Sequence, residues 1–141
     1  MHNLYGWFDG SCTPYNPGGY GGWGIVLKNS DNELIHKDGG KLEKGPHMSN
    51  NVAEYFAVAD LLELIGTVAA KGWSVLIRGD SNLVINQMSG KWKVKKGMYL
   101  EQFHRAQKEL MKLQKMGIAV TFEWVPREQN QEADELSVSA G

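Results

Sequence analysis

Residues 4–39 of the chain read LYGWFDGSCTPYNPGGYGGWGIVLKNSDNELIHKDG, and this segment sets the class of fold. Three runs typical of β-strands lie at 4–8, 20–28 and 33–39, separated by a loop rich in Pro and Gly and by the turn Asn29-Ser30-Asp31-Asn32. The short turn predicts that the second and third strands pair as an antiparallel hairpin. Glycines within the second strand indicate a bulge or the close approach of another backbone.

The rest of the chain alternates between helical and strand patterns. The expected elements are a helix from Ser49 or Asn50 to about residue 65, a strand at 73–77, a short helix from Asp80 or Ser81 to about residue 88, an amphipathic helix that starts near Leu100 and ends at Gly117, a strand at 118–125 and a final helix capped by Asn130. Strands that are joined through helices run parallel. The sequence therefore predicts an α/β fold with a mixed five-stranded sheet, three antiparallel strands followed by parallel ones, flanked by helices.

Length and composition favour an ordinary globular domain. The chain has 141 residues, which predicts a single domain over 1–141, and its 42% hydrophobic and 22% charged residues argue against a disordered or fibrous chain. Cys12 is the only cysteine, so no disulfide can form within the chain. The sequence contains no apolar run of membrane-spanning length and no secretion signal. We expect a cytoplasmic monomer with no membrane association.

Charge is distributed unevenly along the chain. The net charge of −1 by itself predicts no attraction to an anionic partner. Residues 91–115, however, contain eight Lys and Arg but only two Glu, a net charge of +6 that leaves −7 for the remainder. Such a split within one domain indicates an anionic partner for the basic segment, although a solvated surface is the alternative for any single lysine.

Two aspartates directly follow predicted strands. Asp9 follows the strand at 4–8 and begins Asp9-Gly10-Ser11, a sequence typical of a turn, and Asp80 follows the strand at 73–77. Sites in open α/β sheets gather at the carboxyl ends of strands, which makes both aspartates candidate site residues. The alternatives are an ordinary turn residue for Asp9 and a helix cap for Asp80.

Two further carboxylates lie on predicted helices. Glu54 shares one helix face with Val58, Leu61 and Ile65, where a carboxylate is costly unless it is paired or bound to a metal. The alternative is a position at the rim, where Glu54 reaches water. Asp134 lies near the start of the last helix, where acidic residues are common. Four such carboxylates suit hard divalent cations such as Mg²⁺, two of which can clamp the attacking and leaving oxygens of a phosphodiester.

Four motifs resemble those of type 1 ribonuclease H, in the order of that family and over essentially the whole chain. They are DGSC with NPGGYG at 9–12 and 16–21, SNNVAE at 49–54, GDS at 79–81 and PREQNQEAD at 126–134. The resemblance implies the ribonuclease H-like fold. It also implies an endonuclease that cleaves the RNA strand of RNA/DNA hybrids and leaves 5′-phosphate and 3′-hydroxyl ends.

The resemblance assigns roles to the carboxylates. It implies that the catalytic residues, which also hold two Mg²⁺ ions with Mn²⁺ as a possible substitute, are Asp9, Glu54, Asp80 and Asp134. Asp9 would bridge the two ions, while Asp80 and Asp134 would each mainly serve one. Glu54 would also approach the ribose 2′-hydroxyl, the group that distinguishes RNA from DNA.

Other positions match family contacts to the hybrid. By resemblance, the residues at the minor groove or backbone are Cys12, Asn16, Asn50, Asn51 and Asn82, and Ser49 helps to hold a DNA phosphate. Because Asn and Ser are common in turns and caps, a purely local role is the alternative for each of them.

Two segments depart from the pattern of many family members. Residues 91–97, KWKVKKG, replace a long basic protrusion, as in a protrusion-lacking subgroup found in archaea and many bacteria; here we expect Lys91, Lys93 and Lys95 to contact the substrate and Trp92 to contact a sugar or cover the core. The loop before the last helix lacks the usual histidine, which is thought to aid product release. Arg127 occupies that loop, and we expect it to bind phosphate or assist turnover, with a plain surface arginine as the alternative.

Two other classes of function are alternatives to the nuclease. One is a DNA-cutting enzyme on the same fold, such as a transposase or resolvase relative, against which the compact length and the Asn-Asn-x-x-Glu element at 50–54 argue. The other is a binding module that keeps the fold without the chemistry, against which the retention of all four carboxylates argues.

Overall fold

The computed structural model describes residues 1–139 of the chain. Its elements are, in order, β1 (Leu4–Thr13), β2 (Tyr20–Asn29), β3 (Leu34–Leu42), α1 (Asn50–Val68), β4 (Ser74–Gly79), α2 (Asn82–Met88), α3 (Leu100–Lys115), β5 (Ala119–Trp124), a single 3-10 turn (Arg127–Gln129) and α4 (Gln131–Ser139). Every helix and strand expected from the sequence is present, and only the short 3-10 turn is additional. Among the described residues, no helix is long and apolar enough to span a membrane.

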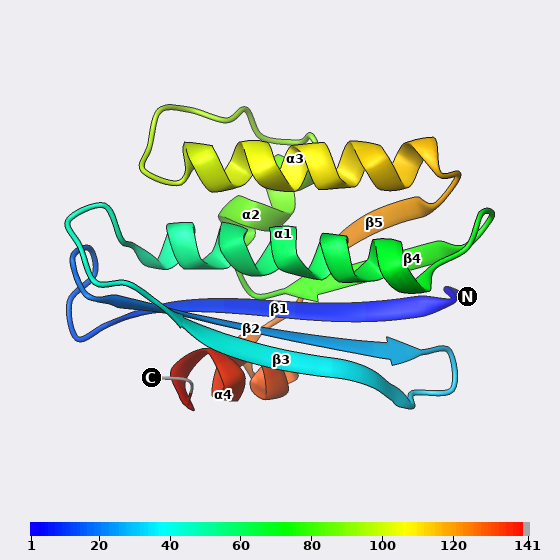
Figure 1. Ribbon diagram of the computed structural model, residues 1–141, viewed down its shortest axis with the longest axis horizontal. Helices are drawn as coiled ribbons and strands as arrows, with labels where there is room; N and C mark the ends of the chain where they lie inside the picture. The colour runs from blue at the N-terminus through cyan, green and yellow to red at the C-terminus, as the bar shows by residue number, and fades with distance from the viewer. Residues whose placement is uncertain (140–141) are drawn as a thin grey trace.

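The strands form one mixed sheet in the order β3-β2-β1-β4-β5. β2 is antiparallel to both β1 and β3, whereas β4 is parallel to both β1 and β5 (Figure 1). This arrangement confirms the predicted mixed five-stranded sheet. It also makes β1 the central strand, with an antiparallel neighbour on one side and a parallel neighbour on the other.

Helices cover both faces of the sheet. α1 lies against β1 and β2 with α3 packed on its outer side, and α4 lies on the opposite face against β1, β2 and β3 (Figure 1). The apolar core fills the layer between α1 and the sheet, where Phe8, Leu61 and Ile77 are fully buried. β1, which carries Asp9, therefore lies between α1 on one face of the sheet and α4 on the other.

The turn predicted at Asp9-Gly10-Ser11 is wrong, because β1 continues through it. Asp9 pairs with Gly24 and Gly10 with Trp23 in an unbroken ladder that extends to Thr13. A Cβ atom on Gly10 would lie 2.2 Å from the backbone nitrogen of Glu54. The glycine after Asp9 thus allows α1 to approach the strand, and it does not mark a turn.

The glycines of β2 allow a second close approach, as their pattern predicted. Cβ atoms on Gly22 and Gly24 would lie 1.8 Å from the carbonyl oxygen of Ser137 and 2.3 Å from that of Ala133. α4 can therefore rest directly on β2. A register irregularity also occurs between β2 and β3, at Leu27 and Lys28.

Helix starts agree with the sequence except at the last helix. Ser49 caps α1 by accepting a hydrogen bond from the Val52 amide at 3.2 Å, and Ser81 caps α2 in the same way through the Val84 amide at 3.2 Å. The side chain of Asn130, expected to cap the final helix, instead donates from Nδ2 to the carbonyl of Phe8 at 2.9 Å. This bond ties the start of α4 to β1, so a long-range contact replaces the local one.

Candidate functional site

Three of the four candidate carboxylates meet just beyond the point where the parallel pairing of β1 with β4 ends. Asp9, Glu54 and Asp80 each offer an oxygen atom, and these atoms lie within 4.8 Å of one another. The register pairs Trp7 of β1 with Arg78 of β4, so Asp9 and Asp80 lie level with each other two residues further along their strands. α1 brings Glu54 to the same point through its close packing on Gly10.

Glu54 is the member of this cluster that α1 contributes, and its side chain is buried. Its exposure is 5%, and its Oε2 atom has no hydrogen-bond partner among the described residues. Burial, followed by the charges of Asp9 and Asp80, raises the pKa of the Glu54 carboxyl well above its usual value, although the Gly10 amide donates to it and opposes this rise. The alternative of a water-exposed rim position is therefore wrong for Glu54.

Asp9 is the central member of the cluster. Its exposure is 4%, and the Ser137 hydroxyl donates to its Oδ2 at 2.9 Å. Burial, then the contact with the Asp134 carboxyl, then the charge of Asp80 raise the pKa of Asp9 to about 8. The site holds more carboxylates than it can ionise without a countercharge.

Asp134 lies beside this trio and not within it. Its carboxyl contacts that of Asp9, and its side chain keeps 27% of its surface exposed. The guanidinium of Arg127, from the loop before α4, lies 3.6 Å from Asp134 Oδ2, while the Arg127 side chain is 76% exposed. The predicted set of four is therefore a compact trio with a fourth, more accessible carboxylate at its edge.

The donor set fits a hard divalent cation. It consists of carboxylate oxygens, and one of them, on Glu54, is buried without a hydrogen-bond partner among the described residues. The repulsion between these carboxylates is relieved either by a bound cation or by protonation. Asp9, Glu54, Asp80 and Asp134 are the side chains that could hold such ions. The cost of burying these groups is removed when a cation binds among them.

The amino-terminal end of α1 gathers the predicted polar contacts of the β1–β2 loop. Asn16 Nδ2 donates to Asn50 Oδ1 at 2.9 Å, and the backbone N–H of Asn50 donates to Asn16 Oδ1 at 3.1 Å. Cys12 lies next to them, with its thiol donating to the carbonyls of Tyr15 at 3.0 Å and Met48 at 3.8 Å. Asn16, Asn50 and Cys12 form one polar surface about one helical turn before Glu54, while the Ser49 hydroxyl that caps α1 is buried.

The remaining predicted contact residues lie around this surface or beyond α2. Asn51 is half-buried in the first turn of α1, and Asn82 is exposed as the first residue of α2. Lys91, Trp92, Lys93 and Lys95 line a groove of about 430 Å³ together with Leu83, Gln87 and Tyr99. No helix or strand forms over residues 89–99, in agreement with a short replacement for a longer protrusion.

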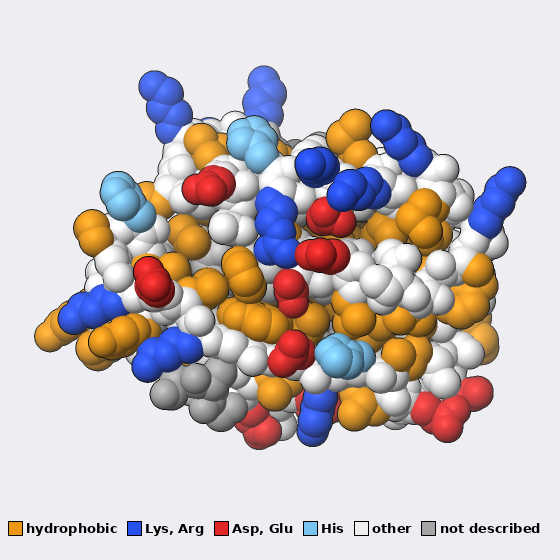
Figure 2. Space-filling model, in the orientation of Figure 1, with side chains coloured by type: hydrophobic (Ala, Val, Ile, Leu, Met, Phe, Trp, Pro, Cys, Tyr) orange, Lys and Arg blue, Asp and Glu red, His pale blue; other side chains and the backbone are white. Residues whose placement is uncertain are grey.

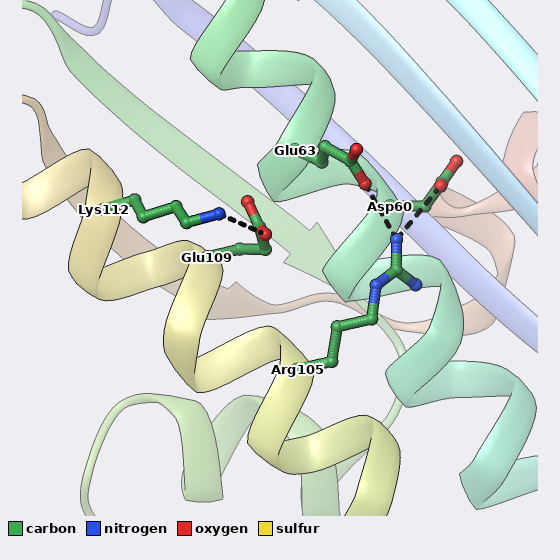
Figure 3. A network of polar contacts seen from close by, with 5 residues as sticks. All are labelled: Asp60, Glu63, Arg105, Glu109 and Lys112. Atoms are coloured by element: carbon green, nitrogen blue, oxygen red, sulfur yellow. Dashed lines mark hydrogen bonds and ion pairs between the residues drawn. The ribbon is translucent and has the colours of Figure 1, made fainter.

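The basic segment divides into two parts with different roles. Arg105 of α3 bridges to α1, with Nη2 lying 2.9 Å from Glu63 and 3.5 Å from Asp60, as Figure 3 shows. Lys112 pairs with Glu109 of its own helix at 3.2 Å (Figure 3). The expectation that the whole +6 stretch faces an anionic partner therefore fails for Arg105, whose charge holds two helices together.

The lysines of the loop before α3 remain available. Figure 2 shows Lys and Arg side chains over α3 and the preceding loop, with acidic side chains interspersed where α3 meets α1. Among the described residues, no carboxylate forms an ion pair with Lys91, Lys93 or Lys95. Lys96, Lys108 and Lys115 also form no ion pair among the described residues, so these three join them as cations that are free to meet an anion.

Two residues that hold the cluster in place were missed by the sequence reasoning. Ser137 is 1% exposed and connects Asp9 to α4, since its hydroxyl lies within hydrogen-bond distance of both Asp9 Oδ2 and the Asp134 carbonyl. Its position three residues after Asp134 places it on the same helix face, a signal that was available. The sequence pattern indicates only a turn at Gly10, because the packing of α1 on β1 involves residues that are distant in the sequence.

Comparison with known proteins agrees with this geometry. A family model described as reverse transcriptase-like matches residues 7–140. The chain is 35% identical over 125 residues to the bifunctional protein Rv2228c of Mycobacterium tuberculosis, covering 89% of this chain but 32% of that protein. It is 31% identical over 153 residues to the ribonuclease H of Ruegeria sp., covering 97% and 90%. The chain thus spans about a third of the mycobacterial relative.

Solved structures show the same similarity. The N-terminal RNase H domain of the Mycobacterium tuberculosis protein superposes with a TM-score of 0.83 at 30% identity, covering 99% of this chain and 94% of that one. LC11-RNase H1, isolated from compost and solved in complex with an RNA/DNA hybrid, gives a TM-score of 0.78 at 28% identity, covering 97% and 95%. The sheet order and its flanking helices define the ribonuclease H-like class of folds. The chain belongs to the ribonuclease H family.

Proposed function

We propose that the protein cleaves the RNA strand of RNA/DNA hybrids by hydrolysis of internal phosphodiester bonds. The observation that carries this proposal is the trio of carboxylates within 4.8 Å, in which a buried oxygen of Glu54 lacks any partner. An acidic cluster of this kind attracts divalent cations and does not bind a phosphodiester without them. Family membership and the hybrid bound to LC11-RNase H1 support the choice of substrate.

We infer that two Mg²⁺ ions, or Mn²⁺ in their place, are held by Asp9, Glu54, Asp80 and Asp134. When bound, such ions supply Lewis acidity that favours attack by water and departure of the 3′ oxygen, leaving 5′-phosphate and 3′-hydroxyl ends. Asp9 touches the carboxyl of Asp134 and has an oxygen within 4.8 Å of one on Asp80, so it is the residue that would serve both ions. Ser137 orients Asp9 through its hydrogen bond, and the Gly10 amide orients Glu54.

The polar surface at the start of α1 is placed to hold the hybrid beside Glu54. We propose that Asn16, Asn50 and Asn51 contact the minor groove, where 2′-hydroxyls are displayed. The reciprocal hydrogen bonds between Asn16 and Asn50 preorganise this pair. Cys12 lies on the same surface, Ser49 is the buried cap directly before Asn50, and Asn82 begins the helix that follows Asp80.

Phosphates away from the cleaved bond would meet the basic groups. Lys91, Lys93 and Lys95, with Trp92 exposed beside them, form the groove described above. Arg127, on the other side of the cluster, is exposed and close to Asp134, so we propose that it binds a phosphate near the cleaved bond and assists product release. A single domain, a monomeric state and a cytoplasmic location stay predictions from the sequence.

Matched duplexes test the proposal directly. RNA/DNA, DNA/DNA and RNA/RNA duplexes of one sequence are incubated with the protein in Mg²⁺ or in chelator, beside Asp80→Asn and the control Asp31→Asn, which removes the same charge from an exposed hairpin turn. We expect loss of the RNA strand of the hybrid only with metal and only in the wild-type and control proteins. Cleavage of DNA/DNA, or full activity of Asp80→Asn, would contradict the proposal.

A further inference from the structure

A single buried amide side chain connects the lysine-bearing loop to the protein core. Gln87, in the last turn of α2, is 5% exposed. Its Nε2 donates to the carbonyl of Lys93 at 3.3 Å and to the hydroxyl of Tyr99 at 3.1 Å, and its Oε1 accepts a hydrogen bond from the hydroxyl of Tyr55. Both amide hydrogens and the oxygen are used, so its orientation is fully determined.

The partners of Gln87 are rigid. Tyr55 is completely buried, and its ring stacks on that of Tyr99 at 5.4 Å between centroids and meets Phe103 edge-on at 5.5 Å. Tyr55 directly follows Glu54 on α1. The amide is thus held by the same helix that supplies a carboxylate of the proposed metal site.

The loop itself has few other attachments. The amides of Lys91 and Trp92 both donate to the Asn86 carbonyl, at 2.9 and 3.0 Å, and Val94 packs on the core. The side chains of Lys91, Lys93 and Lys95 are exposed, and Gln87 lies in the groove that they line. The backbone carbonyl of Lys93 is therefore the point at which the centre of the three-lysine array is attached to α2.

We propose that Gln87 is a positioning residue for substrate, holding the loop of Lys91, Lys93 and Lys95 in place so that its charges meet the phosphate backbone in register with the carboxylate cluster. This inference rests on the proposed function. Asp80 lies two residues before the first residue of α2, and Gln87 lies in the last turn of that helix, so α2 joins the carboxylate cluster to the loop that carries the lysines.

Preorganisation explains why a buried polar residue serves better here than an apolar one. Lysine side chains lose much conformational freedom when they are held, and a mobile backbone would add to that loss on each binding event. Gln87 removes the backbone part of the cost before substrate arrives. A core residue with no role beyond stability would leave substrate affinity unchanged once the protein is folded.

The test compares Gln87→Met, which keeps the volume and removes all three hydrogen bonds, with Leu113→Ala, which disturbs the buried end of α3 away from the groove. Hydrogen exchange of the amides of residues 90–97 is measured without substrate, and kcat and KM are measured on a hybrid with Mg²⁺. Both are repeated in a background with Lys91, Lys93 and Lys95 changed to Ala. If Gln87→Met is unfolded by circular dichroism, Gln87→Glu, which keeps the acceptor for Tyr55, takes its place.

We expect Gln87→Met to speed exchange in residues 90–97 and to raise KM by about tenfold, with kcat within about twofold of wild type, the loss expected for one or two hydrogen bonds. Leu113→Ala should change neither the loop exchange nor KM. In the background without the three lysines, Gln87→Met should raise KM no further, because the two changes remove the same interaction.

An unchanged KM in Gln87→Met, or an equal rise of KM with and without the lysines, would overturn the inference while leaving the nuclease proposal standing. A wild-type protein that neither binds nor cuts the hybrid would remove the nuclease proposal and this role of Gln87 together. In that case the exchange measurement still shows whether Gln87 anchors the loop, which separates the two failures.

Discussion

Replacing Asp9 by Asn should make the metal-free protein more stable at neutral pH while abolishing its activity. The pKa of Asp9 is raised to about 8 in the folded protein, chiefly by burial, from an ordinary value near 3.8. A raised carboxyl pKa means that the folded state holds its proton more tightly than the unfolded state does. The stability associated with that proton is complete below about pH 4 and is lost as the pH rises towards 8.

The size of the effect follows from the two pKa values. One proton costs about 1.4 kcal/mol for each pH unit between them, so wild type in chelator should lose about 3 kcal/mol between pH 5 and pH 7. For a domain of this size that corresponds to a fall in melting temperature of about 10 °C. Asn keeps the acceptor for the Ser137 hydroxyl and carries no charge. The free energy of unfolding of Asp9→Asn should therefore not show the decrease with pH that Asp9 causes in wild type.

Thermal melts by circular dichroism in chelator, from pH 5 to pH 7.5, measure both slopes. We expect Asp9→Asn to melt well above wild type at pH 7.5 and to cleave no hybrid, while Asp31→Asn keeps the wild-type slope because its carboxyl is exposed. Added Mg²⁺ should restore the stability of wild type but not change that of Asp9→Asn. A wild-type melting temperature that is flat or rises over this range would refute the reasoning.

Four further substitutions test separate parts of the structure. Gly10→Ala places a Cβ atom 2.2 Å from the Glu54 backbone, so it should cost about 2–4 kcal/mol in urea unfolding and lower kcat strongly; wild-type values would contradict the close packing. Arg105→Ala should lower the free energy of unfolding by about 1 kcal/mol and leave the salt dependence of hybrid binding unchanged. Lys93→Ala should reduce the slope of the logarithm of the binding constant against the logarithm of the salt concentration by about 0.9. Equal salt slopes for the two variants would show that the division of the basic segment is wrong. Arg127→Ala should lower turnover or hybrid affinity severalfold in steady-state assays, and no change in either would remove its proposed role.

The order of the elements and the mixed sheet were predictable because each element rests on local information. The assignment of four carboxylates to one site stays a prediction, and the structure brings three of them within 4.8 Å of one another. Turn residues, caps and the three-to-four spacing of apolar side chains act over a few positions, and Ser49 and Ser81 cap their helices as this pattern requires. The four motifs that resemble ribonuclease H place their carboxylates at the carboxyl ends of strands or near helix starts. The local pattern nevertheless predicted a turn at Asp9-Gly10, because Asp-Gly is a common turn dipeptide.

Contacts between distant segments decided the rest. β1 remains extended through Gly10 because it pairs with β2 over ten positions, and the same glycine admits α1 so closely that Glu54 becomes buried. The packing of α3 against α1 decided which basic side chains form ion pairs within the fold. Arg105 pairs with Glu63 of α1, whereas Lys93 forms no ion pair among the described residues. Sequence therefore determined which groups are present and on which elements they lie. Only tertiary packing determined their burial and their partners, because the desolvation that raises the pKa of Asp9 and the hydrogen bond from Tyr55 to Gln87 depend on residues far away along the chain.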